Sequence, residues 1–578
     1  MFRSQTGPQW LSVVLCILIV VASSPLPAQS PQQPEQAPSL SIRVSSRLVL
    51  VDVVVTDKRG QPVLGLQSAD FTVMEKGKPQ KISVFTPPSQ TTKAAAPALA
   101  PGVYSNRPEY RSPSGPPTVI VLDAANTPLT DQTNSRMQML KWVVDEYRPG
   151  DRVAIFALTS KLVMLSDFTD DPQVLIAALR QYVAQKSAQT RTPATPDVPA
   201  PISGPGVAES YARVVAELGS MHEADQQRVA GNRANVTVAA MRSLVRILGG
   251  IPGRKNIIWL TAGFPFSLVP QHATGSDTPP SRWNNEPEAA VTSVSELPSD
   301  LGDTQLQRAA GPGVLQAGLD PGQQRLYANK VRDIATQFAS SQVAIYPVDV
   351  TGLDPSLGHD SFDRQQTMKD IARETGGQAF VNQNDLHRGV ELAFADQAAS
   401  YTVGYYPQDK KWDGGYRTIS VKVDHEGVEV RHRRGYFALD PGKADEKMFA
   451  QDLSDAIQDK VSATQIAFYA KVSAIEKGKT RVEFMVDGDS LSAEDSGKGK
   501  HLNMDFEVAI FAADGKQVSN RVMKVDKVLP LETYQQIIQQ GLSVHLDVDT
   551  PPGKTLAWLA VRDNHNGYVG TLQAPVGQ

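Results

Sequence analysis

The feature that most constrains the fold of this chain is a series of short, unbroken apolar segments separated by helix-like stretches. The apolar segments are rich in Val, Ile and Leu and cover residues 118–122, 153–158, 162–165, 256–261, 343–348 and 378–381. Such runs are typical of strands that are buried on both faces, as in a parallel sheet. The stretches between them predict helices near residues 130–148, 171–183, 239–248, 326–338 and 368–374. Repeated strand–helix alternation predicts an α/β fold with a doubly wound, mostly parallel sheet.

The chain divides into segments of different pattern, and its 578 residues are too many for one core. The α/β pattern spans 118–400, with two polar insertions, 186–206 and 267–320, that are too long for compact connections. The expected flanking segments are a small β-module at 42–86, a Pro/Ala/Ser-rich linker at 87–117, a β-extension at 401–440 and a C-terminal β-rich domain of sandwich type at 441–578.

The N-terminus predicts export from the cell. Residues 1–28 have the features of a signal peptide: Arg3, an apolar run at 11–22, and a small residue, Ala28, before the expected cut. A retained anchor is the alternative, although the run is short for a membrane span. Residues 29–41 predict a disordered leader. We therefore expect a secreted, periplasmic or cell-surface bacterial protein, with association with the cell envelope as one expectation and no transmembrane span in the mature chain.

Cysteine content and charge exclude several classes of function. The single cysteine, Cys16, lies within the predicted signal peptide, so the mature chain would have neither disulfides nor thiolate metal ligands. The formal net charge of −4 gives no indication of nucleic-acid binding. The nine histidines show no His-Glu-x-x-His spacing and no cluster suited to zinc, and no Gly-x-Ser-x-Gly element indicates a hydrolase nucleophile. Gly478-Lys479-Thr480 lacks the remainder of a phosphate-binding loop.

One carboxylate stands where α/β sheets bind their ligands. Asp123 directly follows the apolar segment 118–122 and is followed by a loop of small and polar residues. In open α/β sheets, ligands bind outside the carboxyl ends of the strands. Asp123 is therefore the first candidate for a functional residue.

Several stretches resemble those of bacterial proteins with a von Willebrand factor A-type domain, specifically the secreted VWFA-related group of acidobacteria. The matching stretches are 51–57, 70–73, 82–85, 120–127, 253–260, 401–407 and 428–437. The resemblance implies a doubly wound sheet with a metal-ion-dependent adhesion site at its top. In the family this site uses Asp-x-Ser-x-Ser, a Thr from a second loop and an Asp after the fourth strand, and it holds Mg²⁺.

The family's metal site is only partly matched here. Asp123 corresponds to the first Asp, Thr127 to the last hydroxyl, and Thr237 to the second-loop Thr. Ala125 replaces the middle Ser, and Ala262, between Thr261 and Gly263, replaces the distant Asp. Asn126 could supply an oxygen but is one residue out of phase with Ala125. Two interpretations stay open: Mg²⁺ or another divalent cation bound by Asp123, Thr127 and Thr237, or a degenerate site in which Asp123 caps its loop by hydrogen bonding.

The resemblance implies a non-enzymatic interaction protein of adhesion type, which binds an unknown protein partner at the top face of the α/β domain. A purely structural envelope protein without a metal site is the first alternative. A metal-assisted hydrolase that uses Asp123 is the second, and its weakness is that no base or nucleophile is placed nearby.

Overall fold

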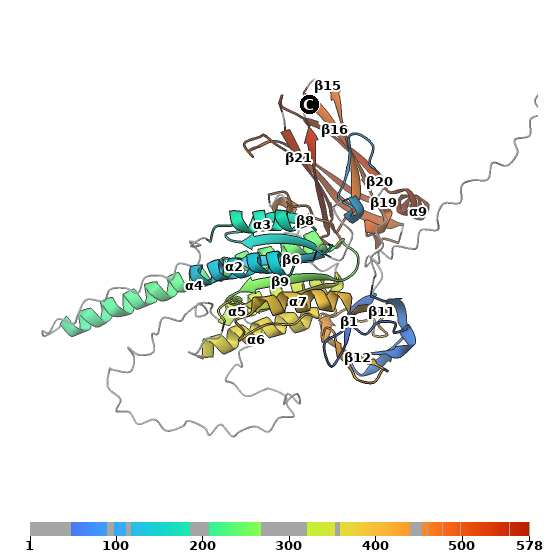
Figure 1. Ribbon diagram of the computed structural model, residues 1–578. Helices are drawn as coiled ribbons and strands as arrows, with labels where there is room; N and C mark the ends of the chain where they lie inside the picture. Colours follow the sequence, from blue (N-terminus) through green and yellow to red (C-terminus); the bar gives the residue numbers. More distant parts are fainter. Residues whose placement is uncertain are drawn as a thin grey trace, which may run out of the picture. The chain divides into compact units, whose positions relative to one another are not determined.

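The computed structural model describes residues 48–88, 98–110, 117–148, 150–184, 207–266, 319, 321–352, 359–439, 453–458, 461–476, 478–497, 499–553 and 555–576 (Figure 1). The predicted signal peptide, the leader 29–41, the insertion 186–206, and all of the insertion 267–320 except Leu319 lie outside these residues. No helix in these ranges is long and apolar enough to span a membrane.

A five-stranded sheet forms the α/β part, in the order β10-β9-β6-β7-β8. Its strands are β6 (Pro117–Asp123), β7 (Arg152–Leu158), β8 (Leu162–Thr169), β9 (Lys255–Thr261) and β10 (Val343–Asp349). All neighbouring pairs are parallel except β7 and β8, which are antiparallel. Four of the five strands are buried along their entire length, as their apolar sequences predicted.

Helices cover both faces of this sheet. Alternate residues of each strand point to opposite faces, so each face presents apolar side chains for helices to cover. Val119 and Val121 of β6 pack in one core with residues of α4, α5 and α6, whereas Ile120 and Leu122 pack in another with residues of α2, α3 and α7. The helices are α2 (Leu129–Asp145), α3 (Pro172–Gln181), α4 (Val207–Leu248), α5 (Pro321–Ser340), α6 (His359–Thr375) and α7 (Leu386–Ala398). The predicted α/β fold is confirmed.

Two local predictions differ in extent from the structure. The helix expected at 239–248 is the end of α4, which has 42 residues and begins at Val207. The strand expected at 378–381 is reduced to one parallel bridge between Phe380 and Val348 at the β10 edge. Asp171 accepts a hydrogen bond from the Gln173 backbone N–H and so caps α3, as its position before Pro172 predicts.

The segments flanking the α/β part in the sequence pair with each other. The first sheet has the order β13-β1-β11-β4 and the second β14-β12-β2-β3. These strands are β1 (Val49–Asp57), β2 (Phe71–Glu75), β3 (Lys78–Gln80), β4 (Ile82–Thr86), β11 (Ser400–Tyr405), β12 (Tyr416–Val423), β13 (Val428–Arg431) and β14 (Gly435–Phe437), with a short 3-10 helix at Ser68–Asp70. The segments 42–86 and 401–440 therefore share two sheets and one core rather than forming two separate units.

The C-terminal segment forms two antiparallel sheets around a common core, in the orders β20-β16-β15-β5 and β17-β18-β21-β22, with β19 paired to β18. Its elements are β15 (Phe468–Glu476), β16 (Lys479–Val486), β17 (Glu494–Asp495), β18 (Lys500–Phe511), β19 (Gln517–Leu529), α9 (Leu531–Gln540), β20 (Leu542–Asp549), β21 (Thr555–Asp563) and β22 (Val569–Val576), with a 3-10 turn at Gly488–Ser490.

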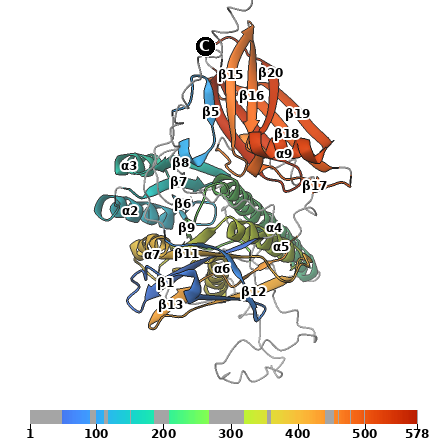
Figure 2. The same cartoon turned by 90° about the vertical axis from the view of Figure 1, so that its right-hand side faces the viewer.

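The predicted linker contains ordered structure that its composition did not indicate. Strand β5 (Val103–Ser105) pairs with β15 across more than 360 residues of sequence (Figure 2). The buried Asn106 side chain strengthens this attachment, since its Nδ2 donates to the carbonyl oxygens of Ala463 and Ile466 and its Oδ1 accepts from the Phe468 N–H. Residues 103–106 are therefore part of the C-terminal sheets rather than a free linker.

Candidate functional site

Asp123 lies at the carboxyl end of β6, in the middle of the sheet. The chain leaves β6 toward β7 on one side, and β9 lies on the other side, so Asp123 stands where the strand order reverses. Its side chain is nevertheless almost completely buried, with 2% of its surface exposed. A carboxyl group in this place needs internal hydrogen-bond donors in place of water.

Asn126 and Trp259 supply such donors, and Thr261 adds a side-chain hydrogen bond. The Asn126 backbone N–H donates to Asp123 Oδ1 at 3.0 Å, and the Trp259 indole Nε1–H donates to Asp123 Oδ2 at 3.0 Å. The Asn126 side-chain Nδ2 lies 3.1 Å from Oδ1 and 2.9 Å from Oδ2. Burial raises the pKa of the Asp123 carboxyl above its ordinary value, while the hydrogen bonds from Asn126 and Trp259 act in the lowering direction.

The Asn126 amide joins two of the three predicted ligand residues. Besides contacting both Asp123 oxygens, Nδ2 donates to Thr237 Oγ1 at 2.9 Å. Asn126 Oδ1 accepts from Arg233 Nε at 3.2 Å, which orients the amide with its nitrogen toward Asp123 and Thr237. Asn126 therefore occupies the point between the Asp123 carboxylate and the Thr237 hydroxyl.

A buried arginine compensates the charge of this carboxyl group. Arg233 comes from α4, and 6% of its surface is exposed. Burial lowers the pKa of the Arg233 guanidinium, and attraction to Asp123 opposes that shift. Because an arginine stays protonated in proteins, a fixed positive charge stands beside Asp123.

Thr127, the third predicted ligand residue, connects the loop after β6 to neighbouring segments. Its Oγ1 accepts the Ala262 backbone N–H at 3.1 Å, and its carbonyl oxygen accepts from Gln132 Nε2 at 2.8 Å. The Tyr182 hydroxyl in turn donates to Gln132 Oε1. These bonds connect the loop after β6 to the loop after β9 and to the start of α2.

Arg364 contacts Ala262 and Gly263, the two residues that follow Thr261. Its Nη1 donates to the Ala262 carbonyl oxygen at 3.3 Å. Gly263 has φ = 150°, and a Cβ there would come within 2.9 Å of the Arg364 side chain. A methyl group at residue 262 and a close-packed arginine thus take the place of an acidic ligand and its surrounding space.

The residues of this site do not fit a divalent metal ion. Mg²⁺ or Ca²⁺ requires several oxygen ligands within about 2.0–2.6 Å of a common point. The point between Asp123 and Thr237 is filled by an N–H donor, and a guanidinium group lies behind it. The hydroxyl of Thr127 is directed to a backbone N–H. The donor set favours a hydrogen-bonded loop over the Mg²⁺ interpretation.

The sequence located part of this arrangement. Asp123 and Thr237 come together as expected, but Thr237 lies within α4 rather than on a loop, and its Oγ1 donates to the Arg233 carbonyl oxygen one turn earlier. Arg233 and Trp259 were not predicted. A signal for Arg233 existed in its spacing of four residues from Thr237, which places both on one face of a helix, but the helix was expected to begin only after Thr237.

No family model and no curated protein matches the sequence. Among solved structures, the chain is similar to the PilB minor pilin from Streptococcus sanguinis, with 13% identity over 49% of this chain and a TM-score of 0.23. This chain spans 61% of that pilin. It is also similar to the vWF domain of the type V pili tip protein Mfa5 from Porphyromonas gingivalis (16% identity, 49% of this chain, 94% of that chain, TM-score 0.19) and to BatB from Bacteroides thetaiotaomicron (12%, 49%, 99%, TM-score 0.21). Likenesses at this level carry no inference about the function of this chain.

Proposed function

We propose that this chain is a secreted, non-enzymatic protein-interaction module of adhesion type, in which a von Willebrand factor A-like α/β domain binds a protein partner without a metal ion. The observation that carries the proposal is the Asn126 amide, which bridges Asp123 and Thr237 and removes both from solvent. A site closed in this way holds its loops in one conformation. It also keeps the Asp123 carboxyl from acting as an exposed acid or base, which argues against the hydrolase alternative.

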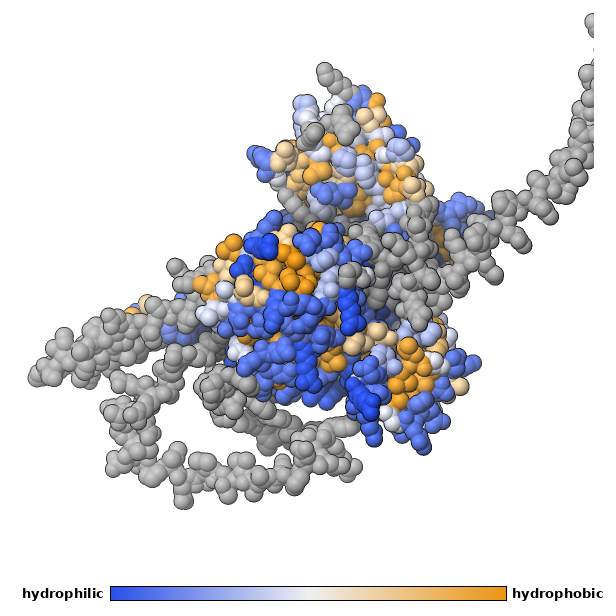
Figure 3. Space-filling view, in the orientation of Figure 1, coloured by the Kyte–Doolittle hydropathy of each residue, from blue (hydrophilic) through white to orange (hydrophobic). Residues whose placement is uncertain are grey.

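Exposed apolar side chains along α2 and α3 support a binding role. Met137 and Val144 of α2 are 53% and 65% exposed, and Val174 of α3 is 43% exposed. Figure 3 shows apolar side chains gathered over α2 and α3. Leu129, which is 39% exposed, lies at the start of α2, at the carboxyl edge of the sheet. We call Leu129, Met137, Val144 and Val174 the α2–α3 patch. Apolar side chains that gather on a surface often mark a protein contact.

The partner would be a protein of the cell envelope or of the extracellular space, consistent with the expected export signal. Because Asp123 is buried, contacts would come from the α2–α3 patch and from exposed residues of the loops, such as Lys161 between β7 and β8. The hydrogen bonds around buried Asp123 would contribute indirectly, by holding the loop after β6 and the start of α2 in one conformation.

Cross-linking capture from envelope and culture-medium fractions tests this proposal. The immobilised full chain is compared with Val144→Glu and with Val522→Glu, a matched control on β19 whose valine is 54% exposed. We expect mass spectrometry to identify a protein that is retained in EDTA, lost with Val144→Glu and kept with Val522→Glu. Capture that requires Mg²⁺ would contradict the metal-independent mechanism. If no captured protein distinguishes the two variants, the structural envelope protein becomes the better interpretation.

A further inference from the structure

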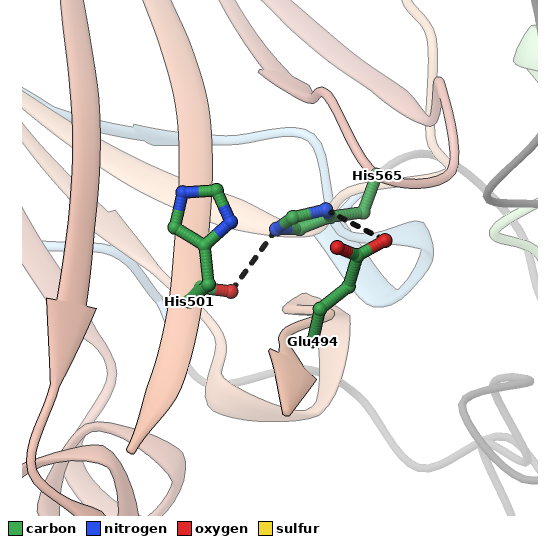
Figure 4. Close-up of side chains that lie close together, drawn as sticks. All are labelled: Glu494, His501 and His565. Carbon is green, nitrogen blue, oxygen red and sulfur yellow. Dashed lines mark hydrogen bonds and ion pairs between the residues drawn. The ribbon is translucent and has the colours of Figure 1, made fainter. Parts of the chain in front are cut away.

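Three potential metal ligands meet in the C-terminal part, far from the Asp123 site in the sequence. Glu494 lies in β17, His501 in β18 and His565 in the turn between β21 and β22. Their potential ligand atoms all lie within 4.8 Å of one another, and Figure 4 shows the three side chains converging. The sequence pattern predicted no cluster of histidines suited to zinc. That prediction missed this group because His501 and His565 are 64 positions apart.

We propose that Glu494, His501 and His565 bind a divalent transition-metal ion of the Zn²⁺ class. Two imidazoles and one carboxylate are a ligand set that Zn²⁺ accepts, with water in the fourth position. In a tetrahedral site with bonds of about 2.0–2.2 Å, neighbouring ligand atoms are about 3.3–3.5 Å apart. His565 Nδ1 and Glu494 Oε1 are 3.4 Å apart, so this pair already has the required spacing. Glu494 is exposed and can adjust to an ion.

The hydrogen bonds of the two histidines leave the same nitrogen of each ring for the ion. His565 Nε2 lies 3.0 Å from the His501 carbonyl oxygen, which can only accept, so this nitrogen carries the proton. His501 Nε2 lies 2.7 Å from Asp526 Oδ1, a carboxylate acceptor that directs the proton to Nε2 in the same way. Both Nδ1 atoms are then lone-pair donors. Metal-binding histidines usually donate their second ring N–H to a carbonyl or carboxylate.

A buried carboxylate holds two of the ligand-bearing segments in place. Asp563 is completely buried at the end of β21 and accepts the backbone N–H groups of His565 and Ser492, both at 2.9 Å. It therefore anchors the turn that carries His565 and the segment that leads to Glu494. The Asn564 N–H donates to the Asn503 carbonyl oxygen in β18, at 2.9 Å, which attaches the same turn to the strand of His501. The ligands are thus positioned by contacts that do not depend on the ion.

An ion at this place would link three segments of a chain that has only one cysteine, Cys16. Without disulfides, the β17 segment, β18 and the β21–β22 turn are joined by non-covalent contacts such as the Lys500–Asp495 ion pair. Because the three ligands come together only in the folded chain, a bound ion would stabilise the folded state and restrict the exposed β17 segment. This proposal is independent of the Asp123 network and of the proposed protein partner.

Zn²⁺ titration of the full chain, purified without a histidine tag, tests the proposal. We expect one Zn²⁺ per chain and, with Co²⁺ in its place, the visible spectrum of a four-coordinate ion. His501→Ala and His565→Ala should each weaken binding by at least about 100-fold, and Asp526→Asn by about 10- to 100-fold through loss of ring orientation. His545→Ala serves as the matched control, because His545 is an exposed histidine on β20. The Zn²⁺ affinity of His545→Ala should equal that of the unmodified chain.

Several results would overturn the proposal. These are no Zn²⁺ binding, equal affinity in the unmodified chain and the His501→Ala/His565→Ala variant, or a six-coordinate Co²⁺ spectrum. If circular dichroism shows that a histidine variant is misfolded, Glu494→Gln decides instead. Its side chain is on the surface, so the substitution leaves the fold intact while removing a ligand. Unchanged Zn²⁺ affinity in Glu494→Gln would then refute the site as described.

Discussion

Asn126→Ala is the substitution that most directly tests whether hydrogen bonds, rather than a cation, hold the loop after β6. It deletes the amide nitrogen that contacts both Asp123 oxygens and Thr237 Oγ1, and the oxygen that accepts from Arg233. It leaves the backbone N–H bond and the Trp259 bond to Asp123 in place. The variant therefore isolates the contribution of the bridge itself.

The magnitude follows from the contacts. An amide nitrogen has two hydrogens, so its three contacts count as two hydrogen bonds. One goes to a carboxylate, worth about 1.5–3 kcal/mol, and one to a hydroxyl, worth about 0.5–1.5 kcal/mol. These two bonds together contribute about 2–4.5 kcal/mol, and the loss of the Arg233 bond to Asn126 Oδ1 adds to this. We therefore expect Asn126→Ala to lower the stability of the α/β part by at least about 2 kcal/mol, because buried Asp123 and Arg233 lose these partners without gaining water.

Hydrogen–deuterium exchange followed by mass spectrometry is the suitable assay, because a chain with several cores is not expected to unfold in a two-state manner. Backbone amides in peptides that cover β6 and β9 should exchange faster in Asn126→Ala, by the factor that corresponds to the expected loss of stability. Asn134→Ala, at an exposed position of α2, is the matched control and should change the opening free energy by less than about 0.5 kcal/mol.

Two results would refute the reasoning. A change below about 0.5 kcal/mol in Asn126→Ala would mean that the amide bridge contributes little. If EDTA alone destabilised β6 in the unmodified chain, or if Mg²⁺ increased its protection, a cation would be stabilising the native site by mass action. The hydrogen-bonded site predicts no effect of either reagent.

Three further predictions concern the rest of the chain. His432 is half-buried, its Nε2 accepts the Val421 N–H, and burial lowers its pKa, so the folded state binds fewer protons than the unfolded state. Stability should therefore fall as the pH drops below about 6.5, by at most about 1.4 kcal/mol per pH unit. In urea titrations, His432→Gln should remove that dependence. Arg417→Met leaves the buried Glu75 side chain without its ion-pair partner and should lower the stability of this part of the chain by about 3–5 kcal/mol, measured by hydrogen–deuterium exchange of β2 peptides. Adding Glu75→Leu should restore most of that stability. Gly377→Ala would place a Cβ 2.0 Å from a carbonyl oxygen of β10 and should destabilise the α/β part by at least about 1–3 kcal/mol in the same assay.

The closed Asp123 site has a consequence for recognition. A metal-dependent adhesion site leaves a coordination position open for a partner's carboxylate. In this chain, Asn126 and Arg233 satisfy Asp123 from within, so an acidic partner group would gain nothing from reaching it. Specificity would then come from exposed side chains such as those of the α2–α3 patch, and binding would be insensitive to divalent cations.

Local periodicity predicted the strand–helix alternation of the α/β part, although it missed α7 and most of α4. The apolar run that ends in Asp123 is a strand buried along its whole length, and the Asp171–Pro172 pair starts a helix, because burial on both faces and helix capping depend on residues close in sequence. The same local rules indicated strands in 42–86 and 401–440. They could not indicate that Val51 pairs with Val403, since that pairing depends on the fold that brings the two segments together.

The sequence by itself predicted that Asp123 ends a buried central strand, and its resemblance to von Willebrand factor A-type domains implied that alanines stand at two metal-ligand positions. Only the tertiary structure decided what replaces the ion. Asn126 belongs to the loop after β6, Thr237 and Arg233 to α4, and Trp259 to β9, so their hydrogen bonds to and around Asp123 exist only when three separate segments pack together. The physical reason is that a buried carboxyl group must be satisfied by whichever donors the fold brings within about 3 Å.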